Sequence, residues 1–109
     1  MQEAIIHLPV TNNYGRNLDH ERSVAEELIL DLFGGFTCEE ATGAWKSPEG
    51  KIYREPMMVY RIAGNWDDDA NVVNLVDLAT DLAASMEQEA IYLALPSGVQ
   101  FIEPMPAAA

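Results

Sequence analysis

Two amphipathic segments, each long enough for a helix, alternate with short apolar segments along this chain, and that order constrains its fold more than any other feature. In each amphipathic segment, apolar side chains recur at spacings of three and four, and acidic side chains occupy mostly the other positions. The first apolar stripe comprises Val24, Ala25, Leu28, Ile29 and Leu32. The second comprises Val72, Val73, Val76, Ala79, Leu82, Ala83 and Met86. Gly34 and Gly35 end the first helix, and the acidic run 67–69 begins the second.

The segments between and beside the helices have strand character. They are short, apolar and bounded by turn-forming residues. Ser47-Pro48-Glu49-Gly50 predicts a hairpin turn between the second and third strands, and Pro56 predicts a break in their pairing. The predicted strands are residues 4–10, 36–45, 52–62 and 90–95, with a short fifth strand at 99–102.

The resulting order is β-α-β-β-α-β with an extra C-terminal strand. This order is typical of the ferredoxin-like, or split βαβ, sandwich, an α+β fold with two helices on one face of an antiparallel sheet. The length of 109 residues fits one domain. We therefore expect a single domain over 1–103 and a disordered tail over 104–109.

The chain is strongly acidic. Eighteen acids against six bases give a formal charge of −12, and no base follows residue 61. Such a surface repels nucleic acid and anionic lipid, so direct nucleic-acid or membrane binding is not expected. The charge would suit a basic protein partner, but solubility is the favoured explanation.

The single cysteine, Cys38, excludes an intramolecular disulfide and favours a reducing compartment. The N-terminus has no basic region followed by an apolar run, so no signal peptide is expected, and no segment approaches the length of a membrane span. We expect a cytoplasmic protein.

No pattern predicts a metal, a cofactor or a catalytic centre. The two histidines, His7 and His20, have no zinc-site spacing. The sequence Asp67-x-Asp69-x-Asn71 resembles the start of a calcium loop but lacks its later ligands, so we interpret it as a helix cap. Acidic neighbours raise the pKa of the Cys38 thiol and disfavour it as a nucleophile.

The hairpin and the first loop carry the best candidates for ligand binding. Both regions combine bases, aromatic rings and amides, and neighbouring first and third strands would bring them to one end of the sheet. The candidate residues are Asn12, Asn13, Tyr14, Arg16, Trp45, Arg54, Glu55, Tyr60 and Arg61. The alternative is that Trp45 packs at the sheet edge, Arg54 forms an ion pair and Tyr60 belongs to the core.

The hairpin also resembles a known group of sequences. Gly35-Phe36-Thr37, Gly43-Ala44-Trp45, Gly50 and Arg54-Glu55-Pro56 are similar to the hairpin shared by a family of small uncharacterised bacterial and phage proteins. The resemblance covers about residues 33–62. It implies a ferredoxin-like fold and no assigned chemistry.

Three functions remain open. The first is a non-catalytic binding module, expected to be a homodimer joined sheet to sheet, which recognises a small anionic or nucleotide-like ligand or a protein partner. The second is a phage-type, anti-defence inhibitor that imitates nucleic acid and occupies the basic groove of an enzyme with Asp67, Asp68, Asp69, Asp77 and Asp81. The third is a small ferredoxin-like enzyme using Arg54, Glu55, Tyr60 or His7 as acid or base.

Overall fold

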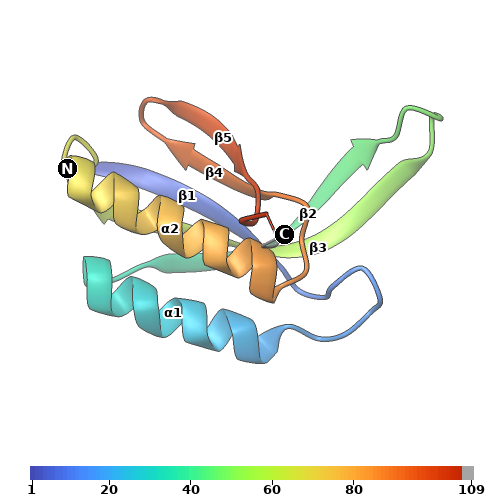
Figure 1. Ribbon diagram of the computed structural model, residues 1–109, viewed down its shortest axis with the longest axis horizontal. Helices are drawn as coiled ribbons and strands as arrows, with labels where there is room; N and C mark the ends of the chain where they lie inside the picture. Colours follow the sequence, from blue (N-terminus) through green and yellow to red (C-terminus); the bar gives the residue numbers. More distant parts are fainter. Residues whose placement is uncertain (107–109) are drawn as a thin grey trace.

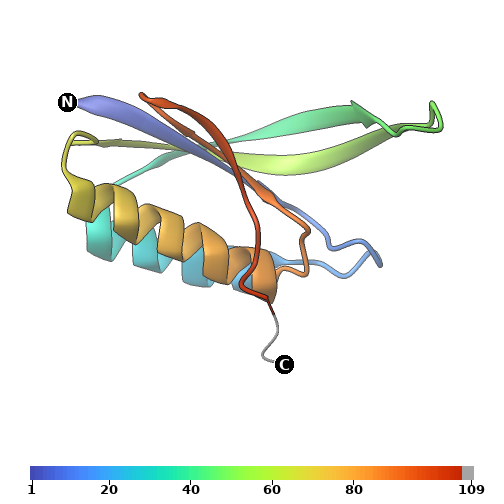
Figure 2. The ribbon, with the colours of Figure 1, turned by 45° about the horizontal axis from the view of Figure 1, so that its top comes forward.

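The computed structural model describes residues 1–106 and has two layers, a five-stranded antiparallel sheet and a pair of helices. The elements follow in the order β1 (Gln2–Pro9), α1 (Asp19–Phe33), β2 (Thr37–Lys46), β3 (Ile52–Gly64), α2 (Asp69–Ser85), β4 (Ile91–Leu95) and β5 (Gly98–Ile102). Both helices lie on the same face of the sheet (Figures 1 and 2). The opposite face, which we call the open face, carries no helix.

The core lies between the sheet and the helices, and alternation along the strands builds it. Ala4, Ile6 and Leu8 of the central strand β1 are fully buried, whereas the residues between them are only partly covered. Because successive strand residues point to opposite faces, one face of β1 enters the core and the other belongs to the open face. β4 repeats the pattern with Ile91, Leu93 and Leu95.

The end of α1 and the start of α2 follow the predicted signals. α1 ends at Gly34, whose φ of 87° is the left-handed cap conformation that glycine adopts without steric cost. α2 is preceded by Asp68, whose side chain accepts a hydrogen bond from the amide of Ala70 at 2.9 Å. The interpretation of the aspartate run as a helix cap is confirmed.

The strand order corrects the predicted fold class. The sheet is ordered β2-β3-β1-β4-β5, and every neighbouring pair is antiparallel. β5 pairs with all five residues of β4, so β4 is an inner strand and β5 forms the edge. The protein is α+β with the order β-α-β-β-α-β-β, and this five-stranded order differs from that of the ferredoxin-like sandwich. The fifth strand itself was predicted, but short local patterns do not show how fully a strand pairs or what order the strands take in the sheet.

Two smaller expectations were also wrong. Val24, Leu28 and Leu32 are 40–43% exposed, and the buried positions of α1 are Arg22, Ala25 and Ile29. The β2–β3 ladder does not break at Pro56, which pairs in register with Thr42. Proline is tolerated there because β1 ends opposite Met57, so no further strand needs the missing amide.

No helix within residues 1–106 combines the length and the apolar character needed to cross a bilayer. Residues 103–106 follow β5 without regular structure. The predicted disordered tail extends to residue 109, and positions 107–109 of it lie outside the described residues.

Candidate functional site

The distal part of the β2–β3 hairpin projects beyond the rest of the sheet (Figures 1 and 2). β1 accompanies β3 only from Met57 onward, so residues 42–56, which we call the arm, form a two-stranded ribbon. The arm closes with the predicted turn. Gly50 has a φ of 87°, and its amide donates to the carbonyl of Ser47 at 2.9 Å.

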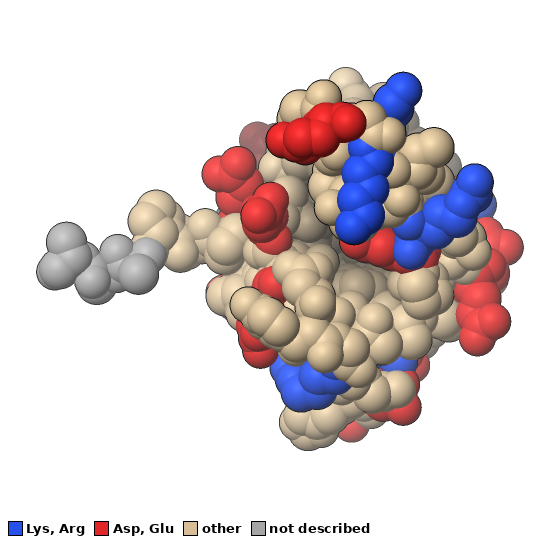
Figure 3. Space-filling model, turned by 90° about the vertical axis from the view of Figure 1, so that its right-hand side faces the viewer, with Lys and Arg blue, Asp and Glu red and all other residues tan. Residues whose placement is uncertain are grey.

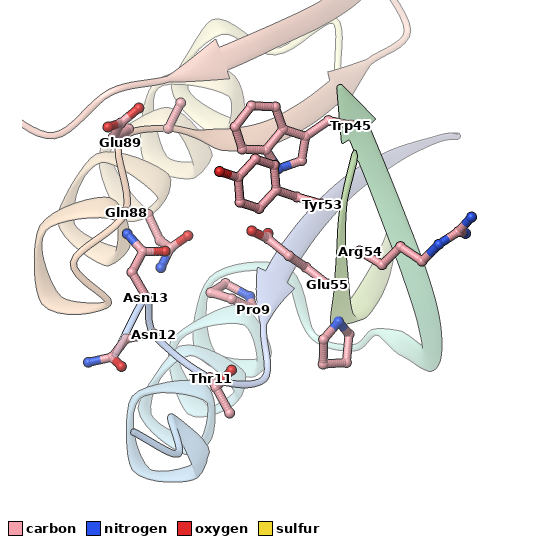
Figure 4. Close-up of a pocket in the computed structure, with 12 residues that line it drawn as sticks. Pro9, Thr11, Asn12, Asn13, Trp45, Tyr53, Arg54, Glu55, Gln88 and Glu89 are labelled. Atoms are coloured by element: carbon pink, nitrogen blue, oxygen red, sulfur yellow. The ribbon is translucent and has the colours of Figure 1, made fainter. Parts of the chain in front are cut away.

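A cavity of about 570 Å³ lies between the arm and two loops of the body (Figure 4). One loop follows β1 and the other joins α2 to β4, so three segments far apart in the sequence meet here. The lining residues are Pro9, Thr11, Asn12, Asn13, Trp45, Tyr53, Arg54, Glu55, Pro56, Gln88, Glu89 and Ala90.

A stacked aromatic pair forms the arm side of the cavity. Trp45 and Tyr53 are register partners across the hairpin, and their ring centroids lie 4.6 Å apart with an interplanar angle of 15°. Trp45 remains 51% exposed, so its ring is accessible to a ligand. The ammonium of Lys51 lies 4.9 Å from the centroid of the Tyr53 ring.

The cavity presents carboxylates rather than bases. Glu55 shares its strand face with Tyr53 and points into the cavity, and Glu89 lines the opposite wall (Figure 4). Arg54 is adjacent to Glu55 in the sequence, but its guanidinium points away (Figure 4). Neighbouring strand residues face opposite sides of the ribbon, so the two charges cannot serve the same site.

The loop after β1 is held in place by its own hydrogen bonds. The Asn12 side chain is 7% exposed, and its Oδ1 accepts from the amides of Tyr14 at 2.9 Å and Arg16 at 2.8 Å. Arg22 of α1 donates from one guanidinium nitrogen to the carbonyls of Pro9 and Val10, each at 2.9 Å. Asn12 therefore shapes the cavity wall, and Asn13 is an exposed amide of this loop that lines the cavity.

Five of the nine predicted ligand residues line this cavity, namely Asn12, Asn13, Trp45, Arg54 and Glu55, but the guanidinium of Arg54 points away from it. The structure places Tyr14, Arg16, Tyr60 and Arg61 elsewhere. Tyr14 is 86% exposed, and Arg16 contacts Glu21 at 3.0 Å and Glu87 at 3.6 Å. Arg61 contacts Glu39 at 3.1 Å and Glu3 at 3.7 Å.

Sequence reasoning missed Tyr53, Gln88 and Glu89 as lining residues. A period of two along the third strand would have placed Tyr53 beside Glu55, and the turn register would have set it opposite Trp45. No sequence signal places the loop before β4 at the same cavity.

Tyr60 belongs to the core and has no access to the cavity. It is fully buried, and its hydroxyl donates to Oε2 of Glu26 at 2.7 Å. Burial, followed by the Glu26 carboxylate, raises the pKa of Tyr60 far above its usual range. Cys38 faces Tyr60 across the ladder, and burial, followed by Glu26, raises the pKa of its thiol. Neither group is poised for acid–base or nucleophilic work near neutral pH.

The open face carries an aromatic row. His7 of β1 stacks on Tyr92 of β4 with centroids 4.2 Å apart, and Phe101 of β5 meets Tyr92 edge-on at 5.8 Å. Burial, followed by the charge of Arg61, lowers the pKa of His7. This histidine is thus a packed strand residue and lies away from the cavity.

The predicted acidic partner surface maps to α2. Asp67, Asp68 and Asp69 precede or begin the helix, while Asp77 and Asp81 follow along its outer side, and all five are exposed. Figure 3 shows the end of the molecule that bears the arm: several bases gather in the upper part, another lies at the lower left, and acids are distributed around them. Within residues 1–106, no group of three or more potential ligand side chains is arranged to hold a metal ion.

Comparisons with known proteins identify a shared fold. No family model and no curated protein matches the chain, so the resemblance of the hairpin to small phage and bacterial proteins stays a prediction. Two solved structures are similar. A phage SAM lyase in complex with S-methyl-5'-thioadenosine matches with a TM-score of 0.57 and 13% identity, and a phage SAM lyase in the apo state matches with 0.59 and 12%. Each alignment covers 94% of this chain and 81% of the other.

Proposed function

We propose that this protein is a phage-type binding module that takes a nucleoside carrying a positive charge, of the class of S-adenosylmethionine, into the cavity beside the arm. The observation that carries the proposal is the stacked Trp45–Tyr53 pair above a cavity into which Glu55 points. The phage SAM lyases of similar fold support the phage character and the ligand class.

The size and the aromatic wall fit a nucleoside. Small-molecule sites commonly enclose about 300–1,000 Å³, and this cavity measures about 570 Å³. A purine stacked on the exposed ring of Trp45 would extend the existing stack. Base–aromatic stacking contributes about 1–3 kcal/mol per base.

The charges fit a cation better than the anion expected from the sequence. Glu55 and Glu89 line the cavity, while the guanidinium of Arg54 points away from it. A phosphate would be repelled by the two carboxylates, whereas a sulfonium or an ammonium group would be attracted by them and by the aromatic faces. The ligand class that fits the cavity is therefore a nucleoside with a positively charged group, in place of the anionic or nucleotide-like ligand expected from the sequence.

The test is calorimetric titration with S-adenosylmethionine, S-methyl-5'-thioadenosine and AMP. We expect the first to bind most tightly, the neutral thioether to bind more weakly, and AMP not to bind. Trp45→Ala should weaken binding of the first two ligands by about 5- to 150-fold, the equivalent of one lost stacking contact. Phe101→Ala removes an exposed aromatic of β5 that does not line the cavity, and it should change nothing.

Glu55→Gln separates the role of charge from that of shape. It should weaken binding of S-adenosylmethionine more than binding of S-methyl-5'-thioadenosine, because only the first carries a positive sulfur. Absence of binding by both nucleosides, or equal affinities in wild type and Trp45→Ala, would contradict the proposal.

A second candidate function is cleavage of the same ligand, favoured by the lyase chemistry named for both structures of similar fold. The bond between sulfur and the amino-acid side chain would break and leave its electron pair on sulfur, giving S-methyl-5'-thioadenosine. The remaining fragment would either lose a proton or close on its own carboxylate, so no further reactant is needed. Glu55 is the lining group placed to accept a proton. Chromatography of S-adenosylmethionine incubated with the protein detects this reaction. Glu55→Gln should abolish the route that loses a proton and leave closure on the carboxylate unaffected.

A further inference from the structure

The arm holds the unpaired positive charge of an otherwise acidic protein. Residues 42–56 contain three of the six bases and two of the eighteen acids, so the arm carries +1 and the remainder of the chain −13. Arg16, Arg22 and Arg61 each contact a carboxylate within 4.0 Å. Among the described residues, Lys46, Lys51 and Arg54 have no such partner, although acids outnumber bases threefold.

The face of the arm that points away from the cavity combines two of these bases with an apolar side chain. Lys46 pairs in register with Ile52, and Ala44 pairs with Arg54, so these four residues share one face, which we call the outer face of the arm. Arg54 marks its direction in Figure 4. Ile52 is 59% exposed. A two-stranded ribbon has little stability of its own in water, so a partner that covers this face and pairs its bases would stabilise the arm.

Helix α2 offers a surface of matching composition. Val73, Asp77 and Asp81 follow one another at intervals of four residues and form one stripe along the outer side of the helix, which we call the α2 stripe. Val73 is 55% exposed, and both aspartates are exposed. Side chains four apart on a helix are separated by about 6 Å, close to the roughly 7 Å between alternate residues of a strand such as Ile52 and Arg54 of β3.

We propose that the outer face of the arm docks on the α2 stripe of a second copy of this chain, with Ile52 against Val73, Arg54 against Asp77, and Lys46 beside Ile52 at the edge of the same acidic surface. A two-fold axis makes both contacts at once, since each copy offers one arm and one stripe. The arm is positive and the remainder of the chain is negative. The arm of one copy is therefore complementary in charge to the α2 stripe of a second copy, which we take as the occupant. This interface differs from the sheet-to-sheet dimer expected from the sequence.

The experiment is sedimentation velocity with two charge-reversed variants. Lys46→Glu/Arg54→Glu makes the arm acidic, and Asp77→Lys/Asp81→Lys makes the α2 stripe basic. In a dimer of either variant alone, the arm and the stripe that meet carry charges of the same sign. We expect wild type to dimerise at about 50 mM salt and to dissociate progressively toward about 0.5 M. Each variant alone should dimerise about tenfold more weakly or worse.

The decisive measurement is made on a mixture of the two variants. An acidic arm then meets a basic stripe, and a basic arm meets an acidic stripe, so the mixture should form a heterodimer about as stable as the wild-type dimer. Circular dichroism and thermal unfolding confirm that each variant is folded. Phe101→Ser, on the open face, should dimerise like wild type.

Three results would overturn the proposal. They are a wild-type protein that stays monomeric at low salt, folded variants that fail to associate when mixed, and loss of the dimer in Phe101→Ser. The last result would place the interface on the open face. None of these measurements involves the nucleoside, so the outcome is independent of the proposed ligand.

Discussion

Replacement of Arg22 by methionine should destabilise the whole domain, although Arg22 carries a charge and lies in an amphipathic helix. Its side chain is only 9% exposed. One guanidinium nitrogen donates to the carbonyls of Pro9 and Val10 at 2.9 Å, and the other contacts Asp19. These bonds join the start of α1 to the end of β1 and to the loop that lines the cavity.

The magnitude follows from the two hydrogen bonds to backbone carbonyls. A hydrogen bond from a charged donor contributes about 1.5–3 kcal/mol to stability. When the donor is removed, a hydrogen bond from water to the partly buried carbonyl restores only part of that free energy. Methionine keeps the apolar stem of the arginine, so the change isolates the loss of donors. We expect Arg22→Met to lower the free energy of unfolding by about 3 kcal/mol, and the melting temperature by roughly 10–20 °C.

Urea denaturation followed by circular dichroism measures the effect. The midpoint should fall while the slope with urea stays constant, since the surface exposed on unfolding is unchanged. Arg16→Met is the matched control, because Arg16 is about half exposed and its contacts with Glu21 and Glu87 are surface ion pairs. A loss below about 1 kcal/mol for Arg22→Met, no larger than an ordinary neutral hydrogen bond, would refute the reasoning.

Three further outcomes follow from the structure. Gly34→Ala should lower the free energy of unfolding, measured by urea denaturation, by about 1 kcal/mol, because the φ of 87° at this position strains any residue with a Cβ. Gly35 does not have a positive φ, so Gly35→Ala should lower the free energy of unfolding by less. The raised pKa of the Cys38 thiol should make its reaction with a disulfide reagent at about pH 8 slower in the folded protein than in urea; equal rates would contradict this. The lowered pKa of His7 means that the unfolded chain binds more protons, so stability should fall as the pH drops below about 6.5 toward the folded value. In urea denaturation, His7→Gln should reduce the loss of stability at low pH. His20 is exposed, and His20→Gln should leave that loss unchanged.

Local signals predicted the elements and their boundaries well. Gly34 and Asp68 cap the helices as expected, and the turn before Lys51 contains a glycine with positive φ. These features depend on a few consecutive residues, so the sequence contains all the information that they need.

Helix packing was less predictable. The periodicity of the first helix marked Val24 and Leu28 for the core, yet both are about 40% exposed, while Arg22 is buried. An apolar stripe gives the direction of the buried face only approximately, and the position of the neighbouring helix decides which positions are covered. A buried arginine needs acceptors from a distant segment, and the carbonyls of Pro9 and Val10 supply them.

The candidate site was predicted only in part, because the orientation of its side chains also depends on the tertiary structure. Trp45, Glu55 and Asn13 were identified because hairpin and loop were expected to lie at one end of the sheet, and they do line one cavity. Arg54 was grouped with them on sequence proximity, but the alternation of a strand turns it to the other side. That single orientation changes the expected ligand from an anion to a cation.

By itself, the sequence of this protein determined its seven elements, its helix caps and its acidic charge, because each of these depends on short-range stereochemistry or on composition. Only the tertiary structure decided that β5 completes a five-stranded sheet, that the loop with Gln88 and Glu89 meets the arm, and that the bases of the arm contact no carboxylate among the described residues. Those outcomes depend on which distant segments pack together, and packing minimises the exposed apolar surface of the whole chain rather than of any one segment.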